Sequence, residues 1–281
     1  MPSIDLQESS IVVGGDRPVV VQVPPGYDAA RPAPLLILLH GYSVSGAATA
    51  SYSGLGPVAA ANGMLFAAPD GTLDPDGNRF WNATEACCDF HGSRVDDSAY
   101  LADLVAEIGD RLSVDAARVY FAGHSNGGFM SYRMACDHAD LVAAVASLAG
   151  STPTGDECDP AEPTAVLQIH GTADGAVRYD GGTIRGASYP GAAETVRTWA
   201  AAGGCDHRPR ASSTLLDLDA QIFGPNGEPA ETRIETWSSG CRPGGHAELW
   251  TIENGGHSPE LTVDFADLVV AFLLAHPKPA G

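Results

Sequence analysis

The segment from Val119 to Met130 contains the residues best suited to chemistry. It reads Val-Tyr-Phe-Ala-Gly-His-Ser-Asn-Gly-Gly-Phe-Met, so a β-branched and aromatic run ends in Gly-x-Ser-x-Gly. A strand, a sharp turn and a helix in this order are typical of a nucleophile elbow with Ser125 at its tip. Gly123 and Gly127 are small enough to let the strand and the helix approach each other. The context favours a nucleophilic serine over a purely structural turn.

Two main-chain amides are candidates for an oxyanion hole. The helix begins directly after Ser125, so its unpaired N–H groups point to where an oxyanion forms, and the amide of Asn126 is the nearest donor. The sequence His40-Gly41-Tyr42-Ser43 follows the apolar run Leu35–Leu39. A turn at this place supplies the second donor, the amide of Tyr42, and we expect the tyrosine ring beside the acyl pocket.

An acid and a base follow later in the chain. The strand ending at Ile169 continues into a turn that contains Asp174. A carboxylate there can orient a histidine and stabilise its imidazolium form, and Asp180 is the alternative. His257 lies in the loop after the last predicted strand, 248–252, from which it can reach back to the nucleophile as the general base.

The substrate-binding candidates are Tyr42, Trp81 and His124. Trp81 lies in a long irregular stretch, residues 72–94, and loops of that length are usually functional or stapled. We expect Trp81 to line the substrate cleft; the alternative is that it pins the loop to the core. His124 neighbours the nucleophile, and packing beneath the elbow explains it better than a part in the chemistry.

The stretch Asp74-Pro75-Asp76-Gly77-Asn78 superficially matches a calcium loop. Arg79 stands where such a loop requires glycine, and no helix leads into the segment. A turn is therefore expected, and no metal site and no cofactor are predicted.

Alternating strands and helices must position these side chains. Leu35–Leu39 and Leu141–Ala149 are continuous apolar runs, as in strands buried on both faces of a mostly parallel sheet. The remaining predicted elements are a hairpin over 11–23, strands over 63–71, 119–122, 165–169 and 232–237, and helices over 46–62, 96–112, 126–137, 191–203 and 263–274; residues 114–118 lead into the strand that begins at Val119.

This order predicts an α/β-hydrolase fold with an antiparallel N-terminal hairpin and helices on both faces of the sheet. The whole chain, residues 1–281, is expected to be a single catalytic domain. Only a short loop of Pro, Gly and Asp separates the strands near 149 and 165, so no large lid is expected and the cleft should admit a long chain.

The composition narrows the partners. With 35 acidic and 15 basic residues the net charge is −20, which argues against nucleic acid and anionic membrane surfaces. No apolar run approaches the length of a membrane span. Neutral or cationic substrates fit this charge balance better. The partner that we expect is a polymeric or small ester substrate, and we expect a monomer.

Six cysteines indicate an oxidising compartment. They form an even set without a C-x-x-C pair, which suits disulfides in an exported protein, whereas reduced buried cysteines are the alternative. The pair Cys205 and Cys241 is the best single candidate, because it would close a long loop with little core of its own. Cys87, Cys88, Cys136 and Cys158 are left without a predicted pairing. The start, Met1-Pro2-Ser3, lacks the basic and apolar regions of a signal peptide, which taken alone indicates a cytoplasmic protein. Because the cysteines indicate the opposite, we expect a secreted enzyme whose leader is absent here.

The chain also resembles a known group, the secreted polyhydroxybutyrate depolymerase and feruloyl esterase family. The matching segments, in order, are His40-Gly41, Phe80-Trp81-Asn82, Cys87-Cys88, Val95-Asp96-Asp97, Arg118 to Gly127, His170 to Asp174 and Gly255-Gly256-His257. The resemblance implies a cofactor-independent esterase. Family members often carry an aromatic residue after the catalytic histidine, whereas Ser258 follows it here, which predicts a more open wall.

The sequence therefore predicts a serine esterase acting on polyesters, aromatic polyesters among them, or on short-chain acyl esters. The rival interpretation is a feruloyl or acetylxylan esterase acting on plant polysaccharide esters. A non-catalytic binding protein on a hydrolase scaffold is the alternative of another class.

Overall fold

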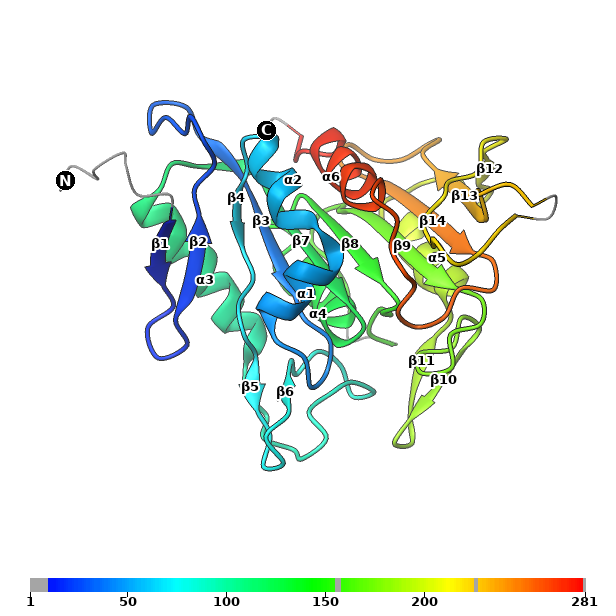
Figure 1. Cartoon of the computed structure of the whole chain (residues 1–281), viewed down its shortest axis with the longest axis horizontal. Coiled ribbons are helices and arrows are strands. Elements are labelled where there is room, and N and C mark those ends of the chain that lie inside the picture. The colour runs from blue at the N-terminus through cyan, green and yellow to red at the C-terminus, as the bar shows by residue number, and fades with distance from the viewer. Residues whose placement is uncertain (1–9, 155–157, 225–226, 280–281) are drawn as a thin grey trace.

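A ten-stranded sheet forms the centre of the computed structural model, which describes residues 10–154, 158–224 and 227–279 (Figure 1). Its middle strands run parallel and its outer strands antiparallel. Across the sheet the order is β1 (Ser10–Val13), β2 (Val19–Gln22), β4 (Leu65–Ala67), β3 (Ala33–Leu39), β7 (Val114–His124), β8 (Ala144–Leu148), β9 (Ala165–Gly171), β14 (His246–Ile252), β13 (Thr232–Trp237) and β12 (Arg210–Ala211).

Helices cover both faces of this sheet. They are α1 (Gly46–Ser53), α2 (Leu55–Ala61), α3 (Asp97–Arg111), α4 (Asn126–Asp137), α5 (Ala192–Ala202) and α6 (Phe265–Ala275). Two cores result: α3, α4 and α5 pack on one face, while α2 and α6 pack on the other. The α/β-hydrolase fold and the antiparallel N-terminal hairpin of β1 and β2 are confirmed.

Strand β3 shows why the central runs are continuously apolar. Leu35, Ile37 and Leu39 point into the first core, and Leu36 and Leu38 point into the second. Successive side chains of a strand alternate between its faces, so a strand with helices on both sides needs apolar residues at every position.

One predicted helix and one predicted irregular stretch contain more elements than expected. The helix expected over 46–62 is two helices, because Gly54 between them has a φ of 66°. Glycine adopts this left-handed conformation without steric cost, so it ends α1. The stretch 72–94 contains a small hairpin of β5 (Thr72–Leu73) and β6 (Arg79–Phe80).

A second hairpin, β10 (Gly181–Ile184) with β11 (Ala187–Pro190), was not predicted from the sequence. Arg185 and Gly186 form its two-residue turn, with φ values of 51° and 95°. Positive φ at both central positions is typical of the type I′ turn that suits a twisted hairpin. In Figure 1 this hairpin and the β5–β6 hairpin project from the same edge of the sheet.

Three disulfides link the cysteines: Cys87 with Cys88, Cys136 with Cys158, and Cys205 with Cys241. The predicted Cys205–Cys241 pair is thus confirmed. None of the helices within the described residues is long and apolar enough to cross a membrane. The first three residues, on which the expectation about a leader depends, lie outside the described residues.

Candidate active site

Ser125 lies at a tight turn between β7 and α4. Its φ of 55° is unusual for a residue with a side chain, as a nucleophile elbow requires. A Cβ atom on Gly123 would overlap the carbonyl group of Gly127, and a Cβ atom on Gly127 would overlap the carbonyl group of Leu39. Both positions therefore need glycine for strand and helix to meet at this distance.

A chain of hydrogen bonds links Ser125, His257 and Asp174. The Ser125 hydroxyl donates to Nε2 of His257 over 2.9 Å, and Nδ1–H of His257 donates to Oδ2 of Asp174 over 2.8 Å. The Asp174 side chain is fully buried, while 24% of the His257 side chain is exposed. The structure thus brings together the three side chains selected from the sequence, whereas Asp180 is exposed and does not contact His257.

Asp174 is held as a carboxylate by its donors. Burial favours its protonated form, but hydrogen bonds from His170, His257 and the amide of Ala176 outweigh burial and lower the pKa of Asp174. His170 was not predicted from the sequence. Its Nδ1 accepts from Gln168, so its proton is on Nε2, which donates to the carbonyl of Val177 over 2.7 Å and also lies 3.2 Å from Oδ2 of Asp174. The charge needed beside His257 is therefore stabilised.

The turn that contains Tyr42 leaves the amide of this residue without an acceptor among the described residues. Buried His40 accepts from the amide of Gly71 at Nε2 and donates from Nδ1 to the carbonyl of Gly41, each over 2.8 Å. The amide of Ser43 donates to the carbonyl of Arg79. Within residues 10–154, 158–224 and 227–279, the amide of Tyr42 has no acceptor.

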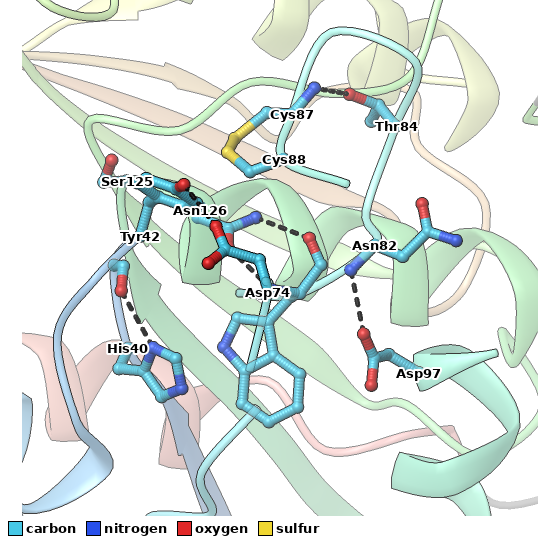
Figure 2. Close-up of a disulfide and its surroundings, with 12 residues drawn as sticks. His40, Tyr42, Asp74, Asn82, Thr84, Cys87, Cys88, Asp97, Ser125 and Asn126 are labelled. Atoms are coloured by element: carbon cyan, nitrogen blue, oxygen red, sulfur yellow. Dashed lines mark hydrogen bonds between the residues drawn. A yellow bond between two sulfur atoms is a disulfide. The ribbon is translucent and has the colours of Figure 1, made fainter. Parts of the chain in front are cut away.

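The amide of Asn126 lies at the other side of Ser125. Asn126 is the first residue of α4, and its amide also lacks an acceptor in the described part of the chain. The amide of Ser125 is occupied, since it donates to the carbonyl of Leu148 over 2.8 Å. Figure 2 shows Ser125, Asn126 and Tyr42 together. A Cβ atom on Gly41 would lie 3.5 Å from the Cβ of Ser125, which places the Tyr42 turn directly beside the serine.

The side chain of Tyr42 joins residues 72–94, here called the wall loop. Its hydroxyl donates to Asp74 over 2.6 Å, and its ring meets the ring of Phe90 edge to face, with centroids 5.1 Å apart. Burial favours protonated Asp74, but hydrogen bonds from Tyr42 and Asn78 prevail and lower the pKa of Asp74 to about 2. The predicted turn at this place is confirmed, since the amides of Asp76 and Asn78 both donate to Asp74.

The prediction that Trp81 lines the substrate cleft is wrong. Its side chain is fully buried and its ring packs against His40, with centroids 5.0 Å apart. The alternative, that Trp81 pins the loop, is correct. A large ring in a long loop gains more from desolvation in the core than it would at an exposed cleft wall.

The side chain of Asn126 holds the same loop, a role that sequence reasoning missed. Its Oδ1 accepts from the amide of Trp81 over 2.7 Å, and its Nδ2 donates to the carbonyl of Trp81 over 2.9 Å. Buried Asp97 accepts from the amide of Asn82 over 2.8 Å (Figure 2). The Cys87–Cys88 disulfide lies on the same loop. Such contacts cannot be predicted from a local sequence pattern, because they join segments that are distant in the chain.

His124 lies partly buried beneath the loop that carries His257. Its ring packs between Tyr52 and His257, with centroid distances of 5.6 and 5.0 Å. Its Nε2 is 2.9 Å from the carbonyl oxygen of His257. Burial lowers the pKa of His124 to about 4, so the ring is neutral at pH 7. The expected packing beneath the elbow describes this position, and a contact with substrate stays a prediction.

The tip of the unpredicted β10–β11 hairpin meets the wall loop. The guanidinium of Arg185 lies over the ring of Phe90, 4.3 Å from its centroid, and donates to the carbonyl of Phe90 over 3.3 Å. At its base, the hydroxyl of Tyr189 accepts from the amide of Arg178, four residues after Asp174. The hairpin therefore connects the acid loop with the aromatic wall.

The comparisons with known proteins agree with this geometry. The family model "Putative esterase" matches residues 10–236. Feruloyl esterase C of Emericella nidulans is 32% identical over 248 residues, which cover 86% of this chain and 76% of that protein. The chain belongs to this esterase family, a family of carboxylic ester hydrolases.

The chain spans less than half the length of another relative that it matches. Feruloyl esterase B of Piromyces equi is 32% identical over 251 residues, which cover 86% of this chain but only 42% of that protein. Among solved structures, acetyl xylan esterase from Aspergillus awamori superposes with a TM-score of 0.66 at 14% identity, covering 95% of this chain and 99% of that chain. That likeness supports the fold alone.

Proposed function

We propose that this esterase hydrolyses carboxylic esters through an acyl-enzyme on Ser125. The observation that carries the proposal is the continuous hydrogen-bond chain from the Ser125 hydroxyl through His257 to Asp174. With the base at 2.9 Å, the hydroxyl can lose its proton as its oxygen attacks the ester carbonyl carbon.

The reaction proceeds in two steps, the acylation of Ser125 and the hydrolysis of the acyl-enzyme by water. The Ser125 oxygen bonds to the acyl carbon, the carbonyl oxygen becomes an oxyanion, and the proton passes to Nε2 of His257. The imidazolium then protonates the departing alkoxide as the ester bond breaks. In the second half, water gives its proton to His257 and its oxygen to the acyl carbon, and Ser125 leaves with the proton returned to it.

Charge is stabilised at both ends of this transfer. The unoccupied amides of Tyr42 and Asn126 flank Ser125 and can donate to the oxyanion, and each such donor contributes about 3 kcal/mol to the transition state. Asp174 remains ionised because its pKa is lowered, so it favours the imidazolium of His257. The burial of Asp174 strengthens this interaction by excluding water.

The substrate class that we favour is an ester of an aromatic or short acyl group on a plant polysaccharide. The names of two relatives, feruloyl esterases B and C, support it. The rings of Tyr42 and Phe90 contact each other, and Tyr42 belongs to the turn beside Ser125, so they supply an aromatic surface against which a planar acyl group can pack. Polyesters are the second candidate. The described residues between β8 and β9 form no helix that could act as a lid, and an open cleft can admit a long chain.

Labelling and a substrate panel test the proposal. A fluorophosphonate should form an adduct on Ser125 in the wild type and none in Ser125→Ala, with similar melting temperatures for both. The absence of an adduct would identify a non-catalytic binder. Rates on methyl ferulate, acetylated xylan, p-nitrophenyl esters, polyhydroxybutyrate and an aromatic polyester then rank the substrates. Clearance of a polymer without turnover of methyl ferulate would reverse our preference.

We also propose that the enzyme works outside the cytoplasm. Three disulfides support this, because thiols are kept reduced in the cytosol of most cells. Protein recovered from an oxidising compartment should show no free thiol after unfolding. Six titratable thiols in active protein from the native host would contradict the proposal.

A further inference from the structure

The catalytic base is carried by a segment with few anchors of its own. The amide of Ala173 donates to the carbonyl of Gly255 over 2.9 Å, which is the last main-chain contact before His257. Beyond it, the carbonyl of Pro259 accepts from the hydroxyl of Tyr52 over 2.8 Å. In the described structure, residues 256–258 make one hydrogen bond through their main chain, and its donor is His124.

We infer that His124 is a positioning residue that sets the distance between Ser125 and His257 by donating from Nε2 to the carbonyl of His257. The inference rests on the proposed function, because it concerns the geometry of that nucleophile and base. His124 is bonded covalently to Ser125 and reaches His257 over 2.9 Å. One side chain thus joins the nucleophile's turn directly to the main chain of the base.

The chemistry of the two atoms defines the tautomer. A carbonyl oxygen only accepts, so Nε2 of His124 must carry the proton. Nδ1 is then unprotonated; it faces Gly41, where a Cβ atom would lie 3.4 Å from it. The oxyanion turn, the elbow and the base are therefore in contact around this ring.

The neutral state of His124 is part of the arrangement. Burial lowers its pKa to about 4, so no proton is added at neutral pH. A charged ring 5.0 Å from the ring of His257 would oppose the imidazolium that forms during catalysis. A neutral donor gives the bond to the carbonyl without this repulsion.

Substitution of the donor tests the inference. In His124→Leu the carbonyl of His257 loses its donor, so kcat should fall about 10- to 100-fold at unchanged KM, since a displacement near 1 Å can cost this much. His124→Gln keeps an N–H at a similar reach and should recover most of kcat. His138→Leu, which removes a histidine bonded to Ser98 away from the site, should retain wild-type kcat.

The rate of fluorophosphonate labelling at Ser125 gives a second readout, which needs no substrate turnover. We expect it to fall in His124→Leu and to recover in His124→Gln. Wild-type labelling in His124→Leu would overturn the inference, and so would a folded His124→Gln as impaired as the leucine variant. If His124→Leu does not fold, the glutamine variant decides alone. Failure of the wild type itself to label would instead refute the proposed function.

Discussion

The two sides of the site are held by different kinds of contact. On one side, Ser125, Asp174 and His257 follow β7, β9 and β14, and parallel pairing brings the ends of these strands to one edge. On the other side, the wall loop is held by buried side chains that bond to its main chain, above all Asn126 and Asp97.

The register of the sheet explains the first kind of contact. Gly171 at the end of β9 lies opposite Ile252 at the end of β14, so the loops with the acid and the base leave the sheet at the same level. A Cβ atom on Gly171 would overlap the carbonyl of Gly255. Strand ends therefore position the reacting groups, whereas individual tertiary hydrogen bonds position the wall loop.

The largest loss of kcat is expected when Asp174, on the side of the site built from strand ends, loses its charge. Asp174→Asn should lower kcat roughly 10⁴-fold, because an amide cannot stabilise the imidazolium and favours the wrong tautomer of His257. Steady-state rates on a p-nitrophenyl ester measure this, with exposed Asp180→Asn as the unchanged control. Equal losses in both variants would mean that Asp174 is not the acid.

A region remote from both sides should affect stability alone. Replacing Cys205 and Cys241 together by serine removes a link between residues 36 apart in the chain. The free energy of unfolding should fall by about 3–4 kcal/mol, as for a loop of this length, while kcat stays unchanged. Urea unfolding and rates on a soluble ester measure the two quantities. A large loss of kcat would show that this region also positions the site.

On the side of the wall loop, removal of a side chain that holds the loop should lower the free energy of unfolding. Asn126→Ala leaves the buried amide of Trp81 without its partner and the carbonyl of Trp81 with the amide of Cys88 as its remaining donor, which should cost about 2 kcal/mol of unfolding free energy. The amide of residue 126 is retained, so kcat should fall far less than in Asp174→Asn. Asn82→Ala, which removes one donor from the same loop, should have a smaller effect on urea unfolding. A loss of kcat equal to that of Asp174→Asn would erase the distinction between the two sides.

The smallest expected effect is a change in how the free energy of unfolding depends on pH. Tyr42→Phe removes a donor that helps to lower the pKa of Asp74 from 3.8 to about 2. A lowered carboxyl pKa stabilises the fold above pH 3.8 and loses its contribution as the pH falls through about 2. The difference in unfolding free energy between wild type and variant should therefore be present at pH 6 and shrink below pH 4. A constant difference across this range would contradict the role assigned to the Tyr42 hydroxyl.

The two sides of the site also differ in how much of each could be predicted from the sequence. Ser125, Asp174 and His257 each follow an apolar run, and such runs are local signals that identify strands. Trp81 was misplaced because a large ring in a loop is equally consistent with a cleft wall and with a core anchor. The hairpin around Arg185 was missed because its strands are four residues each and pair only with each other.

By itself the amino-acid sequence determined the fold, the strands after which Ser125, Asp174 and His257 stand, and the glycines at positions 123 and 127. These depend on periodicity, on local turn chemistry and on the common edge of parallel strands. Only the tertiary structure decided the partners of Asn126 and His124. Their hydrogen bonds join residues 45 and 133 positions apart, and no local pattern records which distant main chain a buried polar group will meet.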